Sequence, residues 1–94
     1  MVFYIKRKKW EAYQVRKATD TVLNLMKQDR EIVSEQWRES VMHQVTDDLT
    51  RIYLWKRVEE RLQENPLVRT RRLDDYKGRR SLQWDWLGEK HAIY

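Results

Sequence analysis

The chain has 94 residues, of which 40% are hydrophobic and 37% are charged, and 20 basic against 15 acidic side chains give it a net charge of +5. A chain of this length has room for one small domain. Because it has no cysteine, disulfides, thiolate-bound metals and thiol catalysis are excluded, and a reducing, intracellular compartment is expected. No apolar stretch approaches the roughly 18 residues of a membrane-spanning helix, so no transmembrane segment is expected.

The first 65 residues contain no helix breaker, because Pro66, Gly78 and Gly88 are the chain's three prolines and glycines. Such a run predicts long helix. An apolar stripe with intervals of three or four residues, typical of one helix face, supports this prediction. The stripe consists of Trp37, Val41, Val45, Leu49, Ile52, Trp55, Val58 and Leu62.

An earlier, shorter stripe runs from Val15 through Ala18 and Val22 to Leu25 or Met26. It leaves two arrangements open, a single helix over about 9–64 or two helices with a break within 27–34. A polar residue, Asp29, interrupts the stripe and favours the break, and Asp29 or Ser34 could cap the second helix. The Asn65-Pro66 pair is expected to end the helical region, since proline cannot continue the hydrogen-bond ladder.

The last 29 residues follow a different pattern, in which Leu82, Trp84 and Trp86 alternate with polar residues. This period of two is typical of an extended segment. The predicted fold class is therefore all-α, with one long helix or a two-helix hairpin followed by an extended C-terminal arm. Within a single domain, residues 1–65 would form the helical region with a basic N-terminal end, and residues 66–94 the basic, tryptophan-containing arm.

Five tryptophans are more than a small helical hairpin can enclose, and tryptophan is enriched among interface anchors. We therefore expect a set of partner-binding residues drawn from the stripe and from the arm. This set is Trp37, Trp55, Leu82, Trp84 and Trp86. The alternative is that the arm folds back onto the chain's own helices.

Positive charge gathers in two segments, since residues 1–17 carry six bases and one acid and residues 67–80 carry six bases and two acids. Such blocks suit phosphate backbones, acidic protein surfaces or anionic lipid headgroups. The residues expected to contact anions or phosphate are Lys6, Arg7, Lys8, Lys9, Arg69, Arg71, Arg72, Arg79 and Arg80.

Catalysis is not expected. His43 and His91 are far apart in the sequence, and no phosphate-binding loop, metalloprotease motif or serine-nucleophile motif is present. Paired acids such as Asp47 and Asp48 are direct neighbours, which point about 100° apart on a helix and do not converge on a substrate. We predict no catalytic residue, no cofactor and no metal.

These features indicate a non-catalytic accessory or structural subunit that docks by a helix and an extended tail among the other protein subunits of a large assembly. The first ten residues are basic and contain no acid, which fits a mitochondrial protein, for example a subunit of a respiratory-chain complex. The alternative is a small basic protein that binds RNA or DNA, including a ribosomal accessory protein. Peripheral contact with a membrane surface is a third possibility.

Overall fold

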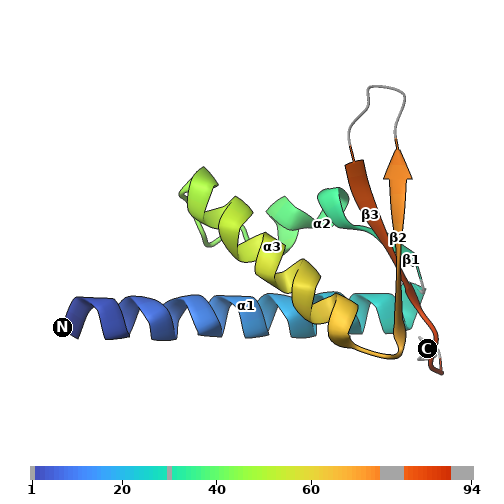
Figure 1. The fold of residues 1–94 in the computed structure, drawn as a ribbon, viewed down its shortest axis with the longest axis horizontal. Coiled ribbons are helices and arrows are strands. Elements are labelled where there is room, and N and C mark those ends of the chain that lie inside the picture. Colours follow the sequence, from blue (N-terminus) through green and yellow to red (C-terminus); the bar gives the residue numbers. More distant parts are fainter. Residues whose placement is uncertain (1, 30, 75–79, 90–94) are drawn as a thin grey trace.

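The computed structural model describes residues 2–29, 31–74 and 80–89 (Figure 1). The elements in chain order are α1 (Val2–Asp29), β1 (Glu31–Val33), α2 (Ser34–Val41), α3 (Asp48–Glu64), β2 (Val68–Asp74) and β3 (Arg80–Trp86). The strands form one sheet in which β3 lies between β1 and β2 and runs antiparallel to both.

The all-α prediction is therefore wrong, because a mostly helical chain also contains an antiparallel sheet. The C-terminal arm is extended over Arg80–Trp86, as its period of two predicted, but it does not lie alone. Its backbone groups pair with β2 over the whole strand and with β1 at Glu31–Val33. This pairing satisfies the N–H and C=O groups that a lone extended segment would leave to water.

The helical region is interrupted twice. The break predicted within 27–34 is confirmed, since α1 ends at Asp29 and α2 begins at Ser34. A second break after Val41 was not predicted, and α3 starts afresh at Asp48 with Asp47 as its N-cap. The Asp47 carboxylate accepts a 2.9 Å hydrogen bond from the Thr50 backbone N–H, which satisfies one of the unpaired donors of the first helical turn. At the other end, Asn65 ends α3 as predicted.

The core lies where α1, α3 and β3 meet. The predicted α1 stripe is confirmed, with Val15, Ala18, Val22 and Met26 all buried. The second stripe is only partly right, because Trp55, Val58 and Leu62 are buried whereas Leu49 is 79% exposed and Ile52 is 51% exposed. Leu49 and Ile52 belong to α3 itself, where each step of three residues falls about 60° short of a full turn, so these two residues lie off the buried face of the helix.

The sheet stands at the C-terminal end of α1, and α3 crosses over α1 before the chain enters β2 (Figure 1). The Trp55 and Trp84 rings join α3 to β3, with their centroids 5.9 Å apart. The Trp55 indole N–H donates to Ser34 Oγ at 2.8 Å, and the Ser34 hydroxyl donates to Glu59 at 3.0 Å. This buried network ties the start of α2 to α3 and to the sheet.

Candidate functional site

A groove of about 260 Å³ lies between α1 and the segment from α2 into the following turn. Its apolar floor includes Leu25 of α1 and Trp37 and Val41 of α2, all three of which are only half-buried. The groove exists because α2 has just eight residues and ends before it can cover this side of α1. Large apolar side chains are thereby left open to solvent in a concave surface.

The rim of the groove is polar and mostly uncharged. The rim side chains are Gln14, Lys17, Thr21, Ser40, His43 and Gln44. No acidic residue is among the described residues that line the groove. The Ser40 carbonyl lies 3.0 Å from His43 Nδ1, and because a carbonyl can only accept, Nδ1 carries the proton there. The rim thus presents amide, hydroxyl and imidazole groups around an apolar centre.

The five predicted partner-binding residues fall into two groups. Trp37 borders the groove, whereas Trp55, Trp84 and Trp86 are buried in the chain's own core and Leu82 packs partly against it. The Trp86 indole N–H donates to the Glu89 carbonyl at 2.9 Å, and the Lys27 ammonium lies 5.1 Å from a Trp86 ring centroid. In this arrangement the arm folds back onto the helices, the alternative that the sequence left open.

The two basic segments lie at opposite ends of the molecule, with the start of α1 far from the sheet (Figure 1). In β2, the Arg69 and Arg71 guanidiniums both contact the Asp85 carboxylate, at 2.7 and 3.2 Å, while Arg72 is exposed. The backbone of Arg80 pairs with that of Asp74 at the start of β3, and Arg79 lies outside the described residues. The single Asp85 carboxylate therefore offsets one of the two positive charges that Arg69 and Arg71 carry, and both arginine side chains stay half exposed.

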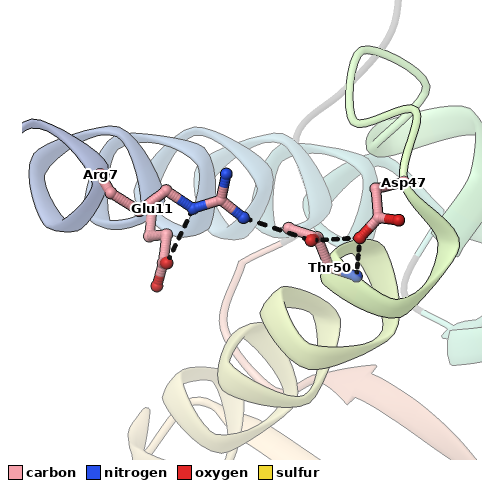
Figure 2. A network of polar contacts seen from close by, with 4 residues as sticks. All are labelled: Arg7, Glu11, Asp47 and Thr50. Carbon is pink, nitrogen blue, oxygen red and sulfur yellow. Dashed lines mark hydrogen bonds and ion pairs between the residues drawn. The ribbon is translucent and has the colours of Figure 1, made fainter. Parts of the chain in front are cut away.

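Figure 2 shows that Arg7 is engaged in a contact between helices. Its guanidinium donates to Glu11 at 3.2 Å and to the Thr50 hydroxyl at 3.3 Å, and Thr50 in turn donates to Asp47. The hydrogen bonds from the Thr50 hydroxyl and backbone lower the pKa of Asp47 below its ordinary value, and the nearby Arg7 charge adds to this effect. Arg7 therefore helps to fix α1 against the start of α3.

Lys6, Lys8 and Lys9 are exposed, as the prediction of an anion-binding segment requires. The structure adds three residues that the sequence analysis missed, the exposed Tyr13, Arg16 and Lys17. The Arg16 and Lys17 cations lie 6.0 and 5.9 Å from the Tyr13 ring centroid. The sequence did contain a signal for these three residues, because their spacing places positions 9, 13, 16 and 17 on one face of a helix.

No cluster of three or more potential metal ligands occurs among the described residues, and no described helix is long and apolar enough to cross a membrane. Comparison with protein-family models, with curated proteins and with solved structures found no match to this chain.

Proposed function

We propose that this chain is a non-catalytic accessory subunit that docks onto a partner protein of a larger assembly through the α1–α2 groove. The observation that supports this function is the half-buried Trp37, which lies beside Leu25 and Val41 in a concave surface. Exposed tryptophans that fill or border pockets are frequent anchors of protein interfaces, where truncation typically costs about 2 kcal/mol or more.

The size of the groove favours a protein side chain over a cofactor. Its volume of about 260 Å³ lies below the roughly 300–1,000 Å³ of most small-molecule sites. One or two apolar side chains of a partner segment would fill it. The uncharged rim residues Gln14, Thr21, Ser40 and Gln44 would then hydrogen-bond to polar groups on either side of that anchor. The proposed occupant is thus a partner segment with an apolar anchor between uncharged polar residues.

A pair of neighbouring substitutions on α2 tests the proposal. Ser40→Trp places an indole in the groove, whereas Glu39→Trp adds the same side chain at an adjacent exposed position that does not line the groove. Each tagged chain is purified from its source cells, and the captured proteins are quantified by mass spectrometry and tested as purified components. We expect a partner that Glu39→Trp retains and Ser40→Trp loses. Equal capture by both variants and the wild type would contradict the proposal.

The location in the mitochondrion and the membership of a respiratory-type complex stay predictions. Their basis is the first ten residues, which are basic and contain no acid, and the same residues equally suit an assembly that contains nucleic acid.

A further inference from the structure

A row of exposed side chains runs along α1 on the face directed away from the core. This α1 stripe consists of Lys6, Lys9, Tyr13, Arg16 and Lys17. At 1.5 Å per residue it spans about 17 Å of straight helix. We propose that the α1 stripe binds the phosphate backbone of nucleic acid without sequence specificity, with Tyr13 favouring single strands. This inference goes beyond the proposed docking function: the α1 stripe adjoins the groove at Lys17, and its other four residues do not line the groove.

The charge of the stripe is available to an external ligand. In the described part of the chain, none of its four cations forms an ion pair with a carboxylate. Glu11, the nearest acid in sequence, is held by Arg7, and Asp20, which follows Arg16 by four residues on the same helix face, forms no ion pair in the described part of the chain. Four cations on about 17 Å of helix can each neutralise a phosphate, which releases counterions and strengthens binding at low salt.

Tyr13 gives the stripe an aromatic centre. Its side chain is 48% exposed, and Arg16 and Lys17 lie within about 6 Å of its ring. A base from an unpaired strand can stack on an exposed aromatic ring while neighbouring cations hold the phosphates. Paired bases in a duplex do not offer such a free face, so the tyrosine favours single-stranded RNA or DNA.

Burial of the apolar face of α1 argues against a lipid surface as the ligand. An interfacial membrane helix inserts a broad apolar face between lipid headgroups. Here that face is part of the core, where Val15, Val22 and Met26 are at most 2% exposed. The stripe itself has no aliphatic residue, and among the described side chains just before it Ile5 is half exposed. The stripe therefore suits the phosphate backbone better than lipid.

The test compares two triple variants that change the net charge equally. One replaces Lys6, Lys9 and Arg16 of the stripe by glutamine, none of which lines the groove, and the control replaces Lys56, Arg57 and Arg61, which are exposed on α3, by glutamine. Binding of a fluorescein-labelled 20-nucleotide oligouridine is followed by anisotropy between 50 and 200 mM salt. Four phosphate contacts to a single strand predict a slope of about −2.8 in log K against log salt, hence a roughly 50-fold loss of affinity over this range.

The stripe variant should reduce the magnitude of that slope by about 2, while the α3 variant leaves it close to wild type. Tyr13→Leu should weaken binding of the single strand at least about fivefold with little change in slope, and leave binding of duplex DNA unchanged.

Ser40→Trp should not alter RNA binding, so failure of the docking proposal is distinguishable. Equal losses in both triple variants would show that net charge alone acts and would overturn the proposal. Tighter wild-type binding to vesicles containing phosphatidylglycerol, or to polyglutamate, than to the RNA would also overturn it. Circular dichroism confirms that each variant is folded.

Discussion

Replacing Trp84 tests whether the C-terminal arm is part of the core. The indole is fully buried, packs 5.9 Å from Trp55 and lies opposite Thr70 in the register of β2 and β3. Removal of a buried tryptophan side chain typically costs about 3–5 kcal/mol. At roughly 0.05–0.15 kcal/mol per residue, a chain of this length has a free energy of unfolding of about 5–14 kcal/mol. Trp84→Ala is therefore expected to remove between about a fifth and all of the stability.

Trp84→Phe provides the matched comparison. The buried Trp84 indole N–H and the Thr70 hydroxyl have no hydrogen-bond partner among the described residues. A buried donor without a partner costs about 1–3 kcal/mol, so phenylalanine removes a penalty while its ring still packs against Trp55. We expect Trp84→Phe to cost less than Trp84→Ala, because phenylalanine leaves a smaller cavity and the loss of the unpaired N–H offsets part of the lost packing.

Urea denaturation followed by far-ultraviolet circular dichroism measures both changes. Leu87→Ala is the control, because Leu87 is 52% exposed and its truncation should cost no more than about 0.5 kcal/mol. If Trp84→Ala unfolds at the wild-type urea concentration with unchanged helicity, the arm is not a structural part of the core. Loss of partner binding in that same folded variant would show that the indole is an interface anchor.

Two further predictions concern polar contacts at helix starts. Ser34→Ala removes the hydroxyl that accepts from the Trp55 indole and leaves this buried donor unpaired. The free energy of unfolding, measured by urea denaturation, should fall by about 1–3 kcal/mol. An unchanged urea midpoint would contradict the hydrogen-bond network of Ser34, Trp55 and Glu59. Because Thr50 lowers the pKa of Asp47, the ionised carboxylate stabilises the folded chain above its ordinary pKa, and this contribution is lost as the pH falls through the lowered value. Asp47→Ala should therefore melt below wild type at pH 7, with the two melting temperatures converging in acid, and a difference that stays constant with pH would refute this account.

Local sequence signals predicted the helices better than the sheet. The buried apolar face of α1 and the end of α3 at Asn65 depend on neighbouring residues, and both are confirmed. The second helix break did have a local signal in the sequence, since Asp47 precedes Thr50 by three residues, the spacing of an N-cap side chain and the backbone N–H that it accepts from. The absence of glycine and proline hid this break, because a side-chain cap can restart a helix without either residue.

The sheet depends on contacts between distant segments. β1 is a three-residue strand between two helices, and its partner lies about 50 residues further along the chain. The sequence of β2 resembles a basic segment more than a strand. Its arginines lie on both faces and hide the alternation of apolar and polar residues that would predict a strand. β3 alone shows a clear period of two, and a single strand does not reveal what it pairs with.

Residues that are clustered in the sequence need not be clustered in space. For this reason the residues predicted to contact anions are distributed over different faces of α1 and β2. On α1, consecutive residues point about 100° apart. Arg7 therefore turns toward Thr50 of α3, while Lys6 and Lys9 lie on the face that carries Tyr13. On β2, neighbours alternate between faces, so Arg69 and Arg71 reach Asp85 while Arg72 belongs to the opposite face. The proposed anion-binding surface therefore consists of residues between 6 and 17 that lie on one face of α1. A shift in the helical phase of α1 would move these side chains off their common face, although the composition of the segment would stay the same.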